Sequence, residues 1–283
     1  MIPSRFEYMS PTSLPEAVAI LAKYPDDAKV LAGGQSLISL LKLRLASPAH
    51  LVDIGRIPNL SYIREEGGKI AIGAMTPYAE LRESKLLQSK CSLLPKAATV
   101  VGDVQVRNRG TLGGSLAHAD PAGDVPAAIL ALGAEIKAVG PKGERWLKAE
   151  NFFTGMYGTE LAGDEILTEV RVPILKDEKT AYLKSARRPS DFAIVGVAVC
   201  LKTGKDGTCE QIAIGVCGVT DKPYRATRVE EKLKGKKLDP DTIKAAAPAI
   251  TEGEYVNGNI HASPEFRSHL ARVYVMRAIL GAS

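Results

Sequence analysis

Two short stretches of the chain place a glycine pair beside small polar side chains: "AGGQS" at residues 32–36 and "TLGGS" at residues 111–115. Glycine has no Cβ, so consecutive backbone N–H groups in such a stretch can approach an anion closely. For a single glycine pair, a tight turn is the simpler interpretation. Two pairs, each flanked by a hydroxyl and each followed by an apolar helical pattern, favour a ligand site, and a diphosphate fits it.

The sequence disfavours the common nucleotide enzymes. It contains no G-x-x-x-x-G-K-[ST] stretch and no G-x-G-x-x-G stretch, so an ordinary NTPase or an NAD dehydrogenase is not indicated. Its four histidines are scattered, and there is no convincing set of nucleophile, base and acid. We therefore expect no catalytic side chains and no metal site, and any organic chemistry would belong to a bound cofactor.

Composition indicates a folded protein of ordinary charge. Of 283 residues, 45% are hydrophobic and 24% are charged, and the net charge of +5 is spread among acidic residues. Nucleic-acid binding is therefore weakly supported, even at the mixed-sign run 230–237. The four cysteines form no C-x-x-C pair, which argues against iron–sulfur or zinc ligation. The N-terminus lacks a signal-peptide pattern and no apolar run is long enough to span a bilayer, so we expect a cytoplasmic protein.

The pattern of the first part predicts two α/β lobes, 1–55 and 56–175. In the first, a capping box at Ser13 predicts a helix over 14–24, and the first glycine motif lies between a short strand and a helix starting at Leu37. In the second, hairpins are predicted at Gly67-Gly68 and at "GPKG". Helices are predicted after Thr76-Pro77, over 93–100 and over 125–132, and a strand ends at Pro173.

A charged connector, "ILKDEKTA", suggests a boundary before a third domain, 176–283. This part predicts two apolar strands joined at "GKDG", followed by three helices. The last helix begins at Ser263-Pro264, and we expect Phe266, Leu270, Val273 and Ile279 to form its buried side.

At this point the motifs point to a family. Taken together, "LAGGQSL", "IGAMTPYAEL", "RNRGTLGGSLAHADPAGD", "DEILTEVRVP" and "DFAIVGVAV" resemble the FAD-binding medium subunit of molybdenum hydroxylases, over nearly the whole chain and in order. That family includes the medium chains of carbon monoxide and aldehyde dehydrogenases, and it is similar to the flavin domain of xanthine dehydrogenase. The resemblance implies an α+β protein: a two-lobed FAD-binding fold of the vanillyl-alcohol-oxidase (PCMH) type plus a C-terminal sheet-and-helix domain.

The resemblance also implies a set of cofactor-binding residues. Both glycine motifs would hold the FAD diphosphate, and Asp124 would contact the cofactor with Asp120 nearby, since carboxylates accept hydrogen bonds from sugar hydroxyls. Asp124 could also be the N-cap of the helix that follows. The full set is Ala32, Gly33, Gly34, Gln35, Ser36, Leu37, Val101, Thr111, Gly113, Gly114, Ser115, His118, Asp120, Asp124, Leu167, Lys184 and Phe192.

Some of these positions carry specific expectations. Leu167 and Lys184 match positions near the flavin, where a lysine would stabilise the negative charge of the reduced ring; without the family, Lys184 would be interpreted as a surface lysine. Phe192 stands where the family commonly has tyrosine, so it can stack but cannot donate a hydrogen bond. Ser115 stands where many members have asparagine. Its hydroxyl can still donate a hydrogen bond, but the serine side chain reaches less far. His118 either touches the adenine side or packs in the loop, which we favour.

The function implied is that of an electron-transfer subunit. In the family, an iron–sulfur small subunit passes electrons from a molybdopterin-binding large subunit to FAD, and FAD passes them to an external acceptor. A dimer of heterotrimers is the implied assembly. Two alternatives remain from the sequence: a scaffold module without redox function, and a stand-alone flavin oxidase. The substrate and the final acceptor are not encoded in a recognisable way.

Overall fold

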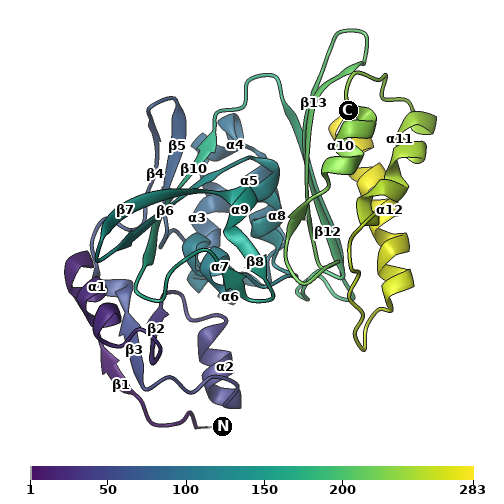
Figure 1. The fold of residues 1–283 in the computed structure, drawn as a ribbon. Helices are drawn as coiled ribbons and strands as arrows, with labels where there is room; N and C mark the ends of the chain where they lie inside the picture. Colours follow the sequence, from purple (N-terminus) through teal and green to yellow (C-terminus); the bar gives the residue numbers. More distant parts are fainter. Residues whose placement is uncertain (1) are drawn as a thin grey trace.

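A computed structural model of the chain describes residues 2–283. Its three sheet-containing parts follow one another in chain order, from the N-terminal part at one end to the C-terminal helices at the other (Figure 1). The mixed α and β composition and the C-terminal sheet-and-helix domain confirm the predicted fold class. The limits 1–55, 56–175 and 176–283 remain a prediction.

The N-terminal part is a three-stranded parallel sheet in the order β1-β3-β2. Its elements are β1 (Glu7–Met9), α1 (Leu14–Lys23), β2 (Ala28–Leu31), α2 (Leu37–Leu43), β3 (His50–Asp53) and the 3-10 turn η1 (Ile54–Arg56). The predicted cap of α1 is confirmed, because the Ser13 hydroxyl accepts the Glu16 N–H. Strand β1 was not predicted: it has only three residues, none fully buried, so its pattern carries little signal.

The central part is a five-stranded antiparallel sheet in the order β4-β5-β10-β6-β7. Its strands are β4 (Ile63–Glu66), β5 (Lys69–Gly73), β6 (Glu135–Gly140), β7 (Gly143–Lys148) and β10 (Ile166–Pro173). Both predicted hairpins are confirmed, and so is the strand ending at Pro173. A two-stranded ribbon, β8 (Phe153–Gly155) with β9 (Gly158–Thr159), lies between β7 and β10 in the chain.

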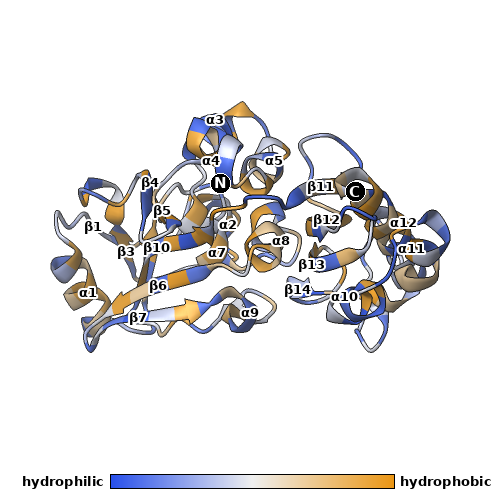
Figure 2. Ribbon diagram, turned by 90° about the horizontal axis from the view of Figure 1, so that it is seen from above, coloured by the Kyte–Doolittle hydropathy of each residue, from blue (hydrophilic) through white to orange (hydrophobic). Residues whose placement is uncertain are grey.

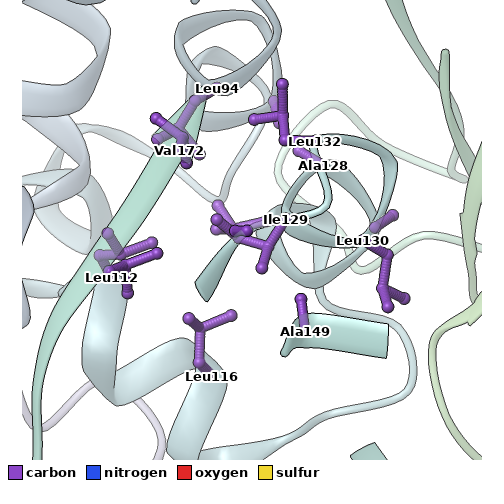
Figure 3. Close-up of a cluster of buried hydrophobic side chains, with 14 of the residues drawn as sticks. Leu94, Leu112, Leu116, Ala128, Ile129, Leu130, Leu132, Ala149 and Val172 are labelled. Atoms are coloured by element: carbon purple, nitrogen blue, oxygen red, sulfur yellow. The ribbon is translucent and has the colours of Figure 1, made fainter. Parts of the chain in front are cut away.

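Seven helices accompany this sheet. They are α3 (Tyr78–Glu83), α4 (Lys85–Lys90), α5 (Leu93–Thr99), α6 (Val104–Arg109), α7 (Leu112–His118), α8 (Asp124–Ala131) and α9 (Ala149–Phe152). The core in Figure 3 joins them to the sheet: Leu94 of α5 lies beside Val172 of β10, and Leu112 of α7 and Ile129 of α8 belong to the same cluster. All eight residues of α8 are buried, which identifies this helix as the centre of the core.

The C-terminal part is a four-stranded antiparallel sheet with helices on one face. Its elements are β11 (Lys179–Ser185), β12 (Val195–Thr203), β13 (Cys209–Cys217), β14 (Tyr224–Arg225), α10 (Thr227–Leu233), α11 (Pro240–Ala246), η2 (Ala247–Thr251) and α12 (Pro264–Ala282). Figure 2 shows α8 on one side of this sheet and α10 and α12 on the other. A Cβ on Gly215 of β13 would overlap the Ala127 carbonyl of α8, so the helix lies directly on the strand.

Helix α12 starts at Ser263-Pro264 as predicted, but most of its predicted buried side is wrong. Phe266 is 48% exposed, Leu270 and Val273 are half-buried, and only Ile279 lies in the core. The buried side consists instead of Arg267, Ala271, Val275, Ala278, Ile279 and Ala282. Small side chains let the helix approach β11 and β12 closely, a preference that a pattern of large apolar residues does not reveal. Among the described residues, no helix has the length and apolarity needed to cross a membrane.

A salt bridge fixes the segment that leads into β10. Arg145 of β7 donates from Nε and a terminal nitrogen to the two Glu165 oxygens, at 2.7 and 2.8 Å, and Glu165 also accepts the Ala162 N–H. The hydrogen bond from Arg145 holds the pKa of Glu165 below its usual value. A lowered folded-state pKa means that the stabilisation is present above the pKa of the unfolded chain and is lost as the pH falls through the folded-state pKa.

We therefore expect Glu165→Gln to lower the free energy of unfolding by about 1 kcal/mol at pH 7, because half of Arg145 is in solvent. The difference from the wild type should shrink as the pH falls from the ordinary carboxyl range, about 4, through the lowered folded-state pKa of Glu165, because the wild-type carboxylate is then protonated as well. Urea unfolding at pH 7 and at pH 3.5 measures both values. An equal cost at the two pH values would contradict this assignment of the pKa shift.

Candidate functional site

The structure brings the two glycine motifs together. Gly33 of the first motif lies so close to the backbone before the second that a Cβ would overlap the Arg109 carbonyl oxygen and come within 3.1 Å of the Gly110 Cα. A Cβ on Gly114 of the second motif would lie 3.8 Å from the Ala32 Cβ of the first. Two stretches almost eighty residues apart thus form one surface, and the absence of a side chain at Gly33 makes the contact possible.

The first motif presents a run of unused donors. It turns from β2 into α2, with Gly34 at φ 75° in the left-handed region that favours glycine. Within the part of the chain that the structure describes, the five N–H groups from Gly33 to Leu37 donate to no protein acceptor. The backbone there is only partly buried. Consecutive N–H groups without acceptors are the donors that an anion such as a diphosphate requires.

The second motif differs from the expectation. The N–H groups of Leu112 and Gly113 donate to the carbonyls of Thr76 and Ala74, at 3.0 and 2.8 Å, and the N–H groups of Gly114 and Ser115 donate to Thr111. From residue 110 to 115, the Thr111 N–H alone has no acceptor among the described residues. The glycine pair therefore serves packing here: a Cβ on Gly113 would lie 2.6 Å from the Ala74 Cβ.

The hydroxyls of the second motif remain available as donors. Thr111 is the N-cap of α7, and its oxygen accepts from Gly114, which leaves the hydroxyl hydrogen free to donate. The Ser115 hydroxyl lies beside Tyr78, a buried tyrosine whose pKa burial raises to about 12. The second motif therefore offers the Thr111 N–H and two hydroxyls rather than a row of backbone amides.

The loop after α7 closes on itself. The Asp120 carboxylate accepts the Ala122 N–H at 2.9 Å, and the Gly123 N–H donates to the Asp120 carbonyl. The His118 ring lies 5.0 Å from the Tyr157 ring, in agreement with the packing role. Burial lowers the pKa of His118, against the opposing charge of Asp120. Asp120 is thus a loop-forming residue that keeps one carboxylate oxygen unused by this turn.

Asp124 and Lys184 form a buried ion pair that joins α8 of the central part to β11 of the C-terminal part. The Lys184 ammonium lies 2.9 Å from one Asp124 oxygen, and the Tyr182 hydroxyl donates to the other at 2.7 Å. Only 5% and 6% of the Asp124 and Lys184 side chains are exposed. Burial raises the pKa of the Asp124 carboxyl, while Lys184 and Tyr182 stabilise its charged form and oppose that shift.

Two interpretations from the sequence are therefore wrong. The N-cap of α8 is Gly123, and Asp124 is the first helical residue, with a carboxylate that points to β11 instead of capping the helix. Lys184 is not a surface lysine, because its ammonium is buried and also donates to the Val100 carbonyl at 3.1 Å. Tyr182 was missed, although alternation along a strand places it on the same face as Lys184.

The remaining predicted residues divide into two groups. Val101 directly follows Val100, which Lys184 contacts, and Leu167 is buried in β10 beside Thr168, whose carbonyl accepts the Ala74 N–H. Val101 and Leu167 are therefore each adjacent in sequence to a residue whose backbone carbonyl accepts one of these hydrogen bonds. Phe192, in contrast, is 66% exposed before β12, and its ring stacks on no other aromatic ring among the described residues. The cofactor roles of all these residues remain predictions.

Two surface hollows lie elsewhere. One is lined by the β6–β7 turn with Arg145 and Glu165, and the other lies between α1 and that turn. In the first hollow, the Arg145 guanidinium already donates to the Glu165 carboxylate. The second hollow is lined mainly by apolar residues such as Val18 and Val139. Neither offers a run of free N–H groups, so we place the candidate site at the glycine motifs.

Comparison with known proteins decides the family. Residues 4–175 match the family described as the FAD binding domain in molybdopterin dehydrogenase, and residues 180–282 match the CO dehydrogenase flavoprotein C-terminal domain. The chain belongs to the FAD-binding medium chains of the molybdenum hydroxylases. The fold expected from the motifs is thereby confirmed, and FAD is the cofactor of this family.

Individual relatives agree over their full length. The carbon monoxide dehydrogenase medium chain of Hydrogenophaga pseudoflava is 40% identical over 99% of this chain and 97% of its own. The glyceraldehyde dehydrogenase medium chain of Sulfolobus acidocaldarius is 38% identical over 98% of each chain. Quinoline 2-oxidoreductase from Pseudomonas putida 86 superimposes with a TM-score of 0.94 at 36% identity, over 100% of this chain and 98% of that one. The medium chain is thus an oxidoreductase subunit.

Proposed function

We propose that this medium chain is the electron-transfer subunit of a molybdenum hydroxylase complex, which accepts electrons from an iron–sulfur subunit and passes them to an external acceptor. The observation that carries the proposal is the run of free N–H groups from Gly33 to Leu37, placed against the second glycine motif. Such a run fits the diphosphate of FAD, the cofactor of the family.

The residues present fit the cofactor. The first motif would hold the diphosphate through its backbone, and the Thr111 N–H and the Thr111 and Ser115 hydroxyls would complete the set of donors. The free oxygen of Asp120 could accept a hydrogen bond from a sugar hydroxyl. When bound, FAD supplies the redox chemistry, since a flavin takes up one or two electrons while iron–sulfur clusters deliver them singly. The chain itself supplies binding, orientation and exclusion of water.

The partners follow from the family and from this chain's residues. Among residues 2–283, no three His, Cys, Asp or Glu side chains gather where they could hold a metal ion. We therefore assign the iron–sulfur clusters to a small subunit and the molybdenum cofactor to a large one, in a dimer of heterotrimers. Relatives named for substrates as different as carbon monoxide, glyceraldehyde and quinoline share this fold, which supports a common electron-transfer role over a substrate-specific one. A cytoplasmic location remains a prediction from the sequence.

A charge placed in the first motif tests the site. Ser36 is the N-cap of α2 but makes no capping hydrogen bond, so Ser36→Asp should leave the fold intact, because aspartate is an equally good N-cap. The new carboxylate would repel the diphosphate, and we expect the FAD dissociation constant to rise about tenfold or more. Titration of the apoprotein with FAD, followed by flavin fluorescence, measures it.

Ser47→Asp is the matched control, since Ser47 is an exposed serine of the same lobe. It adds the same charge away from the glycine motifs, and its FAD affinity should stay within about twofold of the wild type. If Ser36→Asp and Ser47→Asp bind FAD equally well, the diphosphate does not lie at the first motif. A wild-type protein that takes up no FAD, alone or with its partner subunits, would refute the proposed function as a whole.

A further inference from the structure

Helix α12 carries an arginine in an unusual environment. Arg267 is 5% exposed, although arginines are rarely buried unless a carboxylate pairs with them. Among the described residues no carboxylate lies within 4 Å of its guanidinium. One terminal nitrogen donates to the Ile194 carbonyl at 2.6 Å and to the Gly218 carbonyl, and Nε is buried without a partner. Burying a charge on such terms is costly, so its contacts should do more than fill space.

The two carbonyls that Arg267 binds belong to two strand ends that meet. Ile194 directly precedes β12 and Gly218 directly follows β13. Gly218 has φ 80°, and a Cβ there would lie 2.6 Å from the Ile194 oxygen, so the two backbone segments are in close contact. Two carbonyl oxygens that share one donor cannot hydrogen-bond each other. The guanidinium therefore bridges the two backbone segments just beyond the end of the β12–β13 ladder, which pairs Gly196 with Cys217.

Both strand ends in turn hold the candidate site. The Gly218 N–H donates to the Pro121 carbonyl at 2.7 Å, in the loop between Asp120 and Asp124. The Ile194 N–H donates to the Ser185 carbonyl at 2.8 Å, one residue after Lys184. Each residue that Arg267 binds through its carbonyl thus uses its N–H to fix backbone next to a predicted cofactor residue.

We infer that Arg267 is a positioning residue for the FAD site: it fixes, through Gly218 and Ile194, the loop 120–124 and the end of β11. It does not touch the cofactor. The inference rests on the proposed function, because it takes the surroundings of Asp120, Asp124 and Lys184 as part of the cofactor site. It extends the site to a helix whose other buried residues are apolar.

The test compares Arg267→Met and Arg267→Lys in the full-length chain with FAD as the probe. Methionine keeps the length of the side chain and removes every donor, while a lysine ammonium can still donate to two carbonyls. We expect Arg267→Met to raise the FAD dissociation constant about tenfold or more, with a shifted visible flavin spectrum, and Arg267→Lys to restore most of both. Arg272→Met, an exposed arginine of the same helix, is the control and should match the wild type.

The outcomes separate this inference from its premise. If wild-type protein binds no FAD, the proposed function fails before Arg267 is tested. If wild type binds FAD and folded Arg267→Met shows the same affinity and spectrum with only a lower melting temperature, Arg267 is structural and the inference is wrong. If Arg267→Met does not fold, Arg267→Lys decides: FAD binding a few-fold weaker than in the wild type and in Arg272→Met supports the positioning role, and wild-type affinity with a wild-type spectrum overturns it.

Discussion

Replacing Lys184 by methionine should destabilise the protein by about 3–5 kcal/mol, the largest effect we expect from a single side chain. The substitution leaves the Asp124 carboxylate buried with the Tyr182 hydroxyl as its remaining side-chain donor. An uncompensated charge in that position must be protonated or must draw water into the junction between α8 and β11. The free energy of unfolding from urea titration at pH 7 measures the effect.

Two further variants make the comparison specific. The double variant Asp124→Asn/Lys184→Met removes both charges and should recover a large part of the loss, because no buried charge then lacks a partner. Lys69→Met breaks the Lys69–Glu135 pair, in which 42% and 38% of the side chains are exposed, and should cost about 1 kcal/mol or less. A Lys184→Met variant no less stable than Lys69→Met would show that the Asp124–Lys184 pair is not buried as described.

Gly33→Ala should disrupt both stability and FAD binding. The added Cβ would overlap the Arg109 carbonyl, and a rigid backbone cannot move aside as a side chain would. The two glycine motifs must then separate, which we expect to cost about 2–3 kcal/mol by overpacking and to weaken FAD binding about a hundredfold. Thermal unfolding and FAD titration below the melting temperature give the two numbers.

Gly155→Ala is the matched control. Gly155 has no atom nearer than 4.0 Å to an added Cβ and no left-handed φ, so alanine should be tolerated there within about 0.5 kcal/mol, with FAD affinity unchanged. The pairing separates the loss of a close approach from the general effect of replacing glycine. Gly33→Ala with wild-type stability and affinity would mean that the contact between the two motifs does not exist in solution.

Local sequence patterns predicted helix starts and turns correctly where the signal lies within a few neighbouring residues. The Ser13 cap, the Gly67-Gly68 hairpin and the Ser263-Pro264 helix start each depend on residues within a few positions of one another, and all three were found. The predicted side of α12 failed because its burial depends on how closely a sheet approaches. Sequence shows which residues are large, not where small ones are needed.

The residues of the candidate site could be predicted from sequence motifs, but the contacts that these residues make could not. Both glycine motifs were recognised, yet the commitment of the Leu112 and Gly113 N–H groups to the chain itself depends on Thr76 and Ala74, which only the three-dimensional structure brings close. The partner of Lys184 is Asp124, sixty positions earlier and on a different element. No local pattern signals an ion pair between residues that far apart in the sequence. Without the family resemblance, a lysine on a strand is therefore interpreted as a surface residue.

Helix α8 gives the molecule a property that neither half would have alone. It is buried along its whole length and lies directly on β13, so this one helix packs in both the cofactor-binding half and the C-terminal half. A hinge motion between them would have to expose the contact between α8 and β13 to water. The free-energy cost of that exposure grows with the apolar area uncovered. The halves should therefore melt as a single cooperative unit and behave as one rigid body, which keeps any redox group bound on one of them at a constant distance from a partner docked on the other.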